Sequence, residues 1–185
     1  MGEMKKRSYF LFGLILCIGI GIGYILFHQE PAIYRADVYF SPEGQVGKRI
    51  VSAINETKET LDIAIFDFTA SEIQAALEQA KKKGVKIRII ADSRQAKGSH
   101  SVVEAMKQEG FDIKITHGKQ RGIMHNKFAV FDGRIVVTGS YNWTSNAENY
   151  NYENAIFLTD PKVIKTYQNE FSEIWNFVPK NSKKE

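Results

Sequence analysis

The sequence predicts an α/β fold with a mixed sheet, preceded by one N-terminal transmembrane helix. Strand-like and helix-like segments alternate along most of the chain, which is typical of layered α/β proteins. Asp132-Gly133 is a hairpin signal late in this pattern, so antiparallel strands should join the sheet. The third observation is an uncharged apolar run near the N-terminus. The 185 residues, 43% of them hydrophobic, suffice for an anchor and one domain of roughly 150 residues.

The apolar run covers residues 9–27. As a helix it would span about 28 Å, close to the hydrocarbon thickness of a bilayer. Lys5, Lys6 and Arg7 precede it, so the positive-inside rule keeps residues 1–8 in the cytoplasm and sends the rest across. The run is long for a signal peptide and no small-x-small cleavage site follows it. We therefore expect an uncleaved anchor, with secretion after cleavage as the alternative.

Seven strands are predicted from short runs rich in β-branched and aromatic residues. The first alternates as a half-buried strand does, and the second, at residues 61–66, is apolar enough to be a buried strand. Asp132-Gly133 joins the fifth and sixth strands as a two-residue type I′ turn. The expected strands lie at residues 36–40, 61–66, 85–91, 111–115, 126–131, 134–138 and 152–158.

Four helices are predicted from apolar residues spaced three and four apart. Gly84 ends the second helix and Gly110 the third, while Pro161 suits the first turn of the fourth. The helices are expected at residues 47–57, 71–83, 101–109 and 161–177. Together the elements define a domain at residues 36–178, with a linker at 28–35 and a basic tail at 179–185.

The densest set of chemically active residues reads H-x-K-x4-D and then, six residues later, G-S-x-N. His125 and Lys127 are two residues apart, so they lie on one face of a strand, roughly 7 Å from each other. Ser140 and Asn142 repeat that spacing at the end of the next strand. Two adjacent strands therefore bring four polar side chains to one end of the sheet, where they can surround a phosphate.

This string resembles the signature of the phospholipase D superfamily, and most of all that of its small single-motif, Nuc-type bacterial endonucleases. The resemblance covers about residues 36–178 and includes the N-x-E-N-A segment at residues 151–155. It implies an α-β-α sandwich with a mixed central sheet.

The resemblance also implies a role for each residue of the motif. His125 would be the nucleophile that attacks phosphorus and forms a phosphohistidine. Lys127 and Asn142 would hold the non-bridging phosphate oxygens. Ser140 and Glu153 would support them, with Glu153 orienting the imidazole.

Four further residues complete the candidate site. Asp132 belongs to the supporting group, but its place in the turn makes its expected role mainly structural. Lys119 and Arg121, just before the motif, could contact flanking phosphates or lipid headgroups. Trp143 follows Asn142; core packing is its favoured role, and contact with a base or with lipid is the alternative.

Cleavage through a histidine nucleophile needs a second imidazole as general acid, and both can be supplied near neutral pH. The chain has four histidines, but only His125 lies in the signature, and we expect His28, His100 and His117 to be ordinary solvated residues. In the family, single-motif members form two-fold dimers with both motifs at the interface. We therefore expect a homodimer in which a second His125 completes the site. Lysine takes the part of a metal, so no metal or other cofactor is expected.

Bulk charge does not identify the substrate. Without residues 1–27, which hold three basic residues and one acidic residue, the chain has 22 Lys and Arg against 20 Asp and Glu. A net charge of +2 is too small to indicate nucleic-acid binding by itself.

Three functions remain. The favoured one is a metal-independent endonuclease that cleaves DNA or RNA. The alternative is a phospholipase D acting on phosphatidylcholine or cardiolipin, and an inactive binding module comes last. No cysteine follows Cys17, so the chain lacks the zinc-binding insert of some eukaryotic relatives anchored in mitochondria. This favours a bacterial cytoplasmic membrane protein whose catalytic domain is periplasmic or extracellular.

Overall fold

The computed structural model describes residues 14–15, 17–19, 34–120 and 122–177. The chain divides into two compact units, residues 1–33 and residues 34–185. The few described residues of the first unit are helical. Most of the predicted anchor at 9–27 lies outside the described residues, as do residues 1–8, most of the linker and the basic tail. Among the described helices, none has the length and apolar character needed to cross a bilayer.

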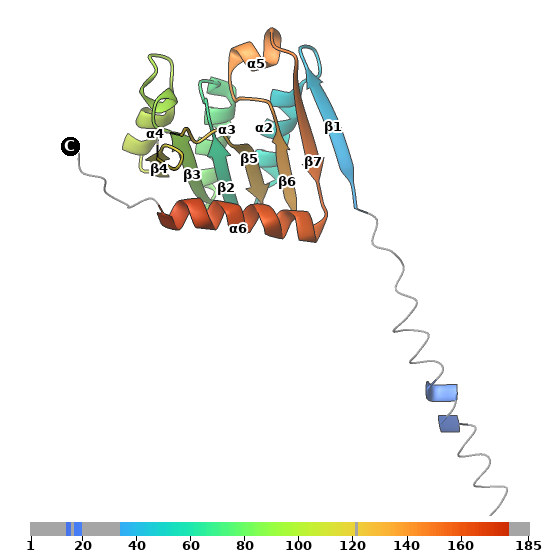
Figure 1. Cartoon of the computed structure of the whole chain (residues 1–185). Coiled ribbons are helices and arrows are strands. Elements are labelled where there is room, and N and C mark those ends of the chain that lie inside the picture. The colour runs from blue at the N-terminus through green and yellow to red at the C-terminus, as the bar shows by residue number, and fades with distance from the viewer. Residues whose placement is uncertain (1–13, 16, 20–33, 121, 178–185) are drawn as a thin grey trace, which may run out of the picture. The chain divides into compact units, whose positions relative to one another are not determined.

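The second unit is built on a seven-stranded mixed sheet with the order β1-β7-β6-β5-β2-β3-β4 (Figure 1). Strands β2, β3 and β4 are parallel, whereas the β2–β5, β5–β6, β6–β7 and β7–β1 pairs are antiparallel. The prediction of a mixed α/β fold is confirmed. The strand bounds are β1 Ala36–Ser41, β2 Thr60–Ile65, β3 Lys86–Asp92, β4 Asp112–Thr116, β5 Lys127–Phe131, β6 Ile135–Gly139 and β7 Glu153–Leu158.

Helices lie on both faces of the sheet, because strand residues alternate between two apolar cores. On β2, Leu61, Ile63 and Ile65 pack in the core beneath α2, α3 and α4, whereas Ala64 packs in the core beneath α6. Figure 1 shows α6 crossing in front of the strands, with α2 and α3 behind them. The helices are α2 Val46–Glu56, α3 Ser71–Lys82, α4 Val103–Gln108, α5 Ser145–Asn149 and α6 Pro161–Phe177, with a 3-10 turn η1 at Gln95–Lys97.

Two helical segments differ from prediction. Helix α4 begins two residues later than expected, because the Ser101 hydroxyl accepts a hydrogen bond from the Val103 N–H and Ser101 stays outside the helix. Helix α5 was not predicted. It starts after Thr144, whose Oγ1 accepts a hydrogen bond from the Ala147 N–H at 3.1 Å.

The Asp132-Gly133 turn has positive φ at both residues, 49° and 61°, as a type I′ hairpin requires. The Asp132 carboxylate accepts three backbone hydrogen bonds, from the N–H groups of Lys58, Glu59 and Thr60. Burial by itself would raise the pKa of Asp132, but these donors outweigh it and hold the pKa below its ordinary value. Asp132 therefore joins the hairpin to the start of β2.

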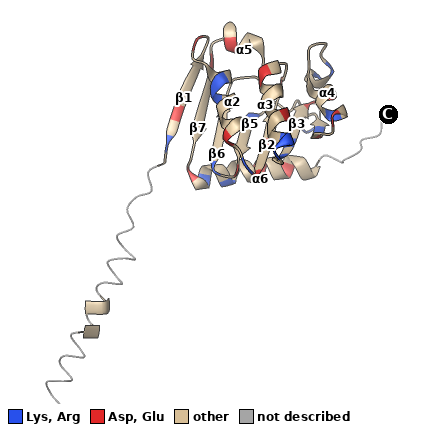
Figure 2. Cartoon of the chain, turned by 180° about the vertical axis from the view of Figure 1, so that it is seen from behind, with Lys and Arg blue, Asp and Glu red and all other residues tan. Residues whose placement is uncertain are grey.

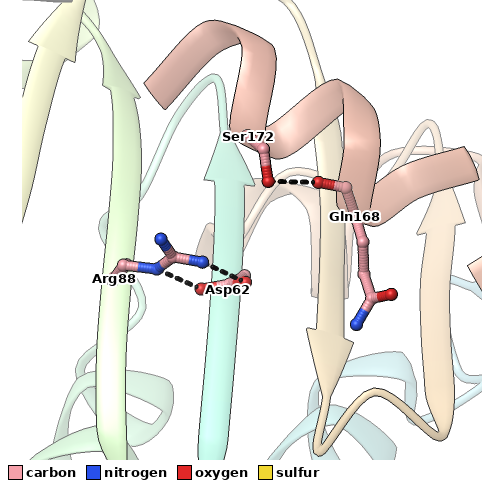
Figure 3. Close-up of polar contacts among 4 residues, drawn as sticks. All are labelled: Asp62, Arg88, Gln168 and Ser172. Atoms are coloured by element: carbon pink, nitrogen blue, oxygen red, sulfur yellow. Dashed lines mark hydrogen bonds and ion pairs between the residues drawn. The ribbon is translucent and has the colours of Figure 1, made fainter. Parts of the chain in front are cut away.

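Helix α6 is held to the sheet by a cation beneath it. The Arg88 guanidinium donates from Nε and Nη2 to the two carboxylate oxygens of Asp62, each at 2.7 Å. The guanidinium carbon, Cζ of Arg88, lies 4.9 Å from the Phe171 ring centroid and 5.4 Å from the Trp175 ring centroid. Figure 3 shows the Arg88–Asp62 pair on β3 and β2, with α6 passing over the strands. The guanidinium thus bridges the sheet and the aromatic side of the helix.

Candidate active site

All the predicted motif residues except Asp132 lie at one edge of the sheet, formed by strand ends. Strands β2, β3, β4 and β6 end there, and β5 and β7 begin there, as follows from their relative directions. We call this the site edge. His125, Lys127, Ser140, Asn142 and Glu153 all lie at it. Asp132 is at the far end of β5, about 20 Å away along the strand, so it supports the hairpin and not the site.

Phe66, the residue after β2, packs against both catalytic candidates at the start of β5. Its ring centroid is 4.5 Å from that of His125, with the rings at 67°. The Lys127 ammonium lies 4.9 Å from the same centroid and donates a hydrogen bond to the His125 carbonyl at 3.0 Å. His125 precedes β5 by two residues and its side chain is exposed. The imidazole is thus accessible, but one aromatic wall limits its orientation.

Lys127 is partly desolvated. Burial lowers its pKa below the ordinary lysine value, although Glu153 and Asp67 both act to raise it. Burial also raises the pKa of Asp67, while the Phe68 N–H and Lys127 act in the opposite direction. The charge of a half-buried ammonium is screened by water less than that of an exposed one, which suits Lys127 to binding a phosphate. Asp67 was not predicted; its only sequence signal is a lone carboxylate directly after a buried strand.

Glu153 is held at both carboxylate oxygens. Ser140 Oγ donates to Oε2 at 2.5 Å, and Asn151 Nδ2 donates to Oε1 at 3.0 Å. Ser140 Oγ also accepts from the Asn154 N–H at 3.1 Å. A Cβ on Gly139 would lie 2.1 Å from the Asn154 carbonyl oxygen, so only glycine permits this approach of β6 to β7. The predicted role of Glu153 in orienting the imidazole stays a prediction.

The loops that follow β2 and β6 are joined through Trp143. The backbone N–H of Trp143 donates to the Asp67 carbonyl. The Trp143 carbonyl accepts hydrogen bonds from the backbone N–H groups of Thr69 and Ala70, both at 2.9 Å. The indole is 2% exposed and packs edge-on against Phe68. Trp143 therefore packs in the core, which is the role favoured for it from the sequence.

Asn142, next to Trp143, has an unmet hydrogen bond. Its Oδ1 is buried and makes no hydrogen bond to any described residue. Buried amide oxygens without a partner are uncommon and call for an explanation. The buried oxygen without a partner belongs to Asn142, which lies at the site edge and is predicted to bind substrate.

Asp92, at the end of β3, is a site residue that sequence reasoning missed. Its carboxylate is fully buried, and Oδ2 accepts a hydrogen bond from the Met124 N–H at 3.0 Å. Oδ1 accepts from the N–H groups of Arg94 and Gln95. Met124 directly precedes His125, so Asp92 fixes the backbone that presents the imidazole. The available signal was an Asp that closes the apolar run I-I-A-D ahead of a polar loop.

A groove of about 650 Å³ opens beside His125. His117 and Lys119 line it from the loop before β5, and that loop also contributes Ile123 and Met124. The opposite wall is the last part of α6, with Glu170, Glu173, Ile174 and Phe177. His117 is exposed, as predicted, but it shares this groove with His125. Arg121 and His28 lie outside the described residues.

The described part of the chain holds no group of three His, Cys, Asp or Glu side chains arranged to bind a metal ion. Helices α2, α3 and α6 each carry both acidic and basic residues (Figure 2). The mixture agrees with the small net charge of the domain.

Comparisons with known proteins point to one family. Residues 50–175 match the family described as "Cardiolipin synthase, PLD-like domain". The mitochondrial cardiolipin hydrolase of Chlamydomonas reinhardtii is 37% identical over 128 residues, which are 69% of this chain and 56% of that protein. The chain thus spans little more than half the length of this relative.

Two solved structures are similar over nearly their whole length. The phospholipase D family member Nuc from Salmonella typhimurium has a TM-score of 0.72 at 32% identity, and the match covers 80% of this chain and 97% of Nuc. NucT from Helicobacter pylori has a TM-score of 0.71 at 25% identity, with 78% and 97% covered. With the family match over most of the domain and the motif gathered at one edge, the chain belongs to the phospholipase D superfamily.

Proposed function

We propose that the chain is a metal-independent phosphodiesterase, and specifically an endonuclease that cleaves DNA or RNA through a phosphohistidine on His125. The observation that carries the proposal is the convergence of His125, Lys127, Asn142 and the Ser140–Glu153 pair at one edge of the sheet. These residues provide a nucleophile and donors for phosphate oxygens, which are the parts that phosphoryl transfer needs. The resemblance to Nuc-type endonucleases and the similarity to Nuc support the choice of nucleic acid.

The first chemical step forms a bond between an imidazole nitrogen of His125 and phosphorus, in line with the leaving oxygen. As the P–O bond breaks, the leaving oxygen takes a proton from a second, protonated imidazole. Lys127 and Asn142 stabilise the charge on the non-bridging oxygens. Water then attacks phosphorus and loses its proton to the second imidazole, and the P–N bond breaks. His125 is neutral again and the second imidazole is protonated again, so the cycle closes.

The second imidazole is His125 of another copy in this proposal. The exposed position of His125 at the site edge supports a shared site, since an exposed imidazole can face its equivalent across a two-fold axis. His117 is the candidate within the same chain, because it lines the same groove as His125. Dilution distinguishes the two sources of the proton, because only the shared site is lost when the dimer dissociates.

A second substrate class is favoured by the groove beside His125. Ile123, Met124, Ile174 and Phe177 give it an apolar wall, and apolar walls suit acyl chains. A relative is named a mitochondrial cardiolipin hydrolase. The alternative is therefore a phospholipase D that hydrolyses phosphatidylcholine or cardiolipin. The proposed location is common to both functions: a single-pass anchor at residues 9–27, with the domain outside the cytoplasmic membrane.

The test uses the purified full chain, in detergent and EDTA, with His125→Ala as its control. Substrates are fluorescent single- and double-stranded DNA, RNA, and vesicles of phosphatidylcholine or of cardiolipin. Cleavage of nucleic acid by the native chain alone supports the endonuclease. Phosphatidic acid release with intact DNA and RNA would replace it with the phospholipase. A rapid quench during turnover of ³²P-labelled substrate should also trap an acid-labile, base-stable protein phosphate, which the His125→Ala variant should lack.

A further inference from the structure

Two tyrosines beside the site are unusually exposed for large aromatic residues. Tyr150 is 76% exposed and Tyr152 is 94% exposed. They lie between α5 and β7, and Tyr152 immediately precedes Glu153 at the site edge. Figure 1 shows α5 at the same end of the sheet as the start of β7. Single exposed apolar residues are ordinary, but here two exposed rings lie on either side of Asn151, next to Glu153.

The backbone that carries the two rings is firmly held. Asn151, between them, donates its N–H to the Asn146 carbonyl at 2.9 Å and accepts from the Ser41 hydroxyl at 3.1 Å. Its side chain donates to Glu153, and the Tyr150 N–H donates to the Asn146 carbonyl. Rigid backbone and free side chains make a pre-organised contact, since a tyrosine has few rotatable bonds to immobilise on binding.

The chemistry of these rings selects the ligand. A phenol offers a phosphate one hydrogen bond, whereas both faces of its ring can stack on a nucleobase. Stacking on exposed aromatic side chains is how many proteins hold single strands. In a duplex the bases are already stacked on one another and their faces are covered. The domain has little net positive charge, so base contacts must supply binding energy that a basic groove would otherwise provide.

We propose that Tyr150 and Tyr152 form a base-stacking platform that gives the active site a preference for single-stranded nucleic acid. The proposal rests on the proposed endonuclease function and names its substrate class. The scissile phosphate lies at His125 and Lys127, and the bases beside it stack on the two rings next to Glu153. Because stacking replaces ion pairing in part, binding should depend weakly on salt.

The experiment compares the full native chain with a Tyr150→Ala, Tyr152→Ala double variant. A Tyr150→Phe, Tyr152→Phe double variant is the matched control, because it keeps the rings and loses only the hydroxyls. Substrates are a labelled single-stranded oligonucleotide, its duplex, and an abasic oligonucleotide of equal length and charge. The alanine variant should lose about tenfold to hundredfold in kcat/KM on the single strand, mainly through KM. On the abasic strand the alanine variant should match the native chain. The phenylalanine variant should match the native chain on all three substrates.

Binding is measured separately in the His125→Ala background by fluorescence anisotropy, so that the platform can be tested without cleavage. The single strand should bind at least tenfold more tightly than the abasic strand, and the Tyr→Ala changes should remove the difference. Affinity should fall less than about tenfold between 50 and 200 mM salt, against a thousandfold or more for a site with many phosphate contacts. Equal losses on normal and abasic strands would overturn the proposal, as would no loss on either.

Two other results would assign the rings elsewhere. A shift of the alanine variant from dimer to monomer in sedimentation, with activity lost on every substrate, would make them an interface between copies. Loss of binding to phosphatidylcholine or cardiolipin vesicles, with single-strand binding intact, would make them a lipid contact. If the native chain cleaves no nucleic acid while the binding difference holds, the endonuclease proposal fails and the platform stands.

Discussion

Asp92 accepts a hydrogen bond from the backbone N–H of Met124, across 32 residues of sequence, and so sets the position of the residue before His125, the proposed nucleophile. Because the carboxylate is fully buried, Asp92→Asn should destabilise the domain by about 1–3 kcal/mol. It should also lower kcat by tenfold or more with little change in KM, since the imidazole is misplaced and the phosphate ligands remain. Urea unfolding and steady-state kinetics measure the two effects. Asp37→Asn, on the exposed side of β1, is the control and should change stability by less than about 0.5 kcal/mol. An Asp92→Asn variant with native kcat would contradict the positioning role.

Asp132 should affect stability without affecting catalysis. Its pKa is lowered in the folded state, so its contribution to stability is present above the unfolded pKa near 3.8 and is lost as the pH falls through the folded value. Asp132→Asn should therefore cost about 1–3 kcal/mol at pH 7 and progressively less below about pH 4. Unfolding free energies at several pH values, with kcat/KM at pH 7, test this. A large loss of kcat/KM in a stably folded variant would show instead that Asp132 contributes to the active site.

Gly139→Ala should disrupt the contact between β6 and β7. The added Cβ would meet the Asn154 carbonyl oxygen at 2.1 Å, and backbone cannot yield cheaply at this distance. The Ser140–Glu153 hydrogen bond should be lost with the displacement, so activity should fall by tenfold or more along with stability. Thermal unfolding and kcat/KM are the readouts. Ser140→Ala is the informative companion, because it removes the same hydrogen bond without the steric overlap and should reduce activity with a smaller change in Tm.

Activity should survive EDTA and follow a bell-shaped pH profile. One imidazole must be neutral to attack phosphorus and another protonated to release the leaving group, so the rate falls at both extremes. Full inhibition by EDTA that is reversed by a divalent cation would show that a metal, and not Lys127, stabilises the transferring phosphoryl group. Lys127→Met should lower activity at least a hundredfold, both in EDTA and with a divalent cation present. This loss is expected for a group that stabilises transition-state charge.

Specific activity should follow the fraction of dimer. Dilution through the dissociation constant of the dimer should lower activity per chain, and sedimentation at the same concentrations should give the matching curve. Mixing native chains with an excess of His125→Ala chains should inhibit the native enzyme, because mixed dimers hold only one imidazole. An active monomer would direct attention to His117, and His117→Ala would then abolish activity.

The sequence predicted the elements and missed the contacts between distant segments. Every predicted strand agrees with the structure within one residue, because apolar runs and turn residues are local signals. The pairing of β1 with β7 joins segments more than a hundred residues apart, and no local pattern encodes it. The hydrogen bond from Met124 to Asp92 was missed for the same reason.

Two further features were not predicted, because the residues that form them are mostly polar. Helix α5 has only five residues and one buried side chain, so it has no apolar face that a periodic pattern could reveal. Asp67 resembles a loop residue in the sequence, and only the fold places its carboxylate near Lys127. The motif residues other than Asp132 were all found at one edge of the sheet, and their catalytic roles are predictions that the experiments above test.

The place of β1 in the sheet determines how the domain responds to mechanical load. β1 is the first strand of the domain and lies at the border of the sheet, with Ala36 opposite Leu158 and Ser41 opposite Glu153. A pull exerted on the chain ahead of Arg35 therefore reaches the two Arg35–Thr159 hydrogen bonds first. It then peels the ladder open one pair at a time, beginning with Ala36 and Leu158. The Ser41–Glu153 pair, at the site edge, is the last to part. Tension would fray the end of the domain remote from the chemistry while the catalytic residues stayed in register.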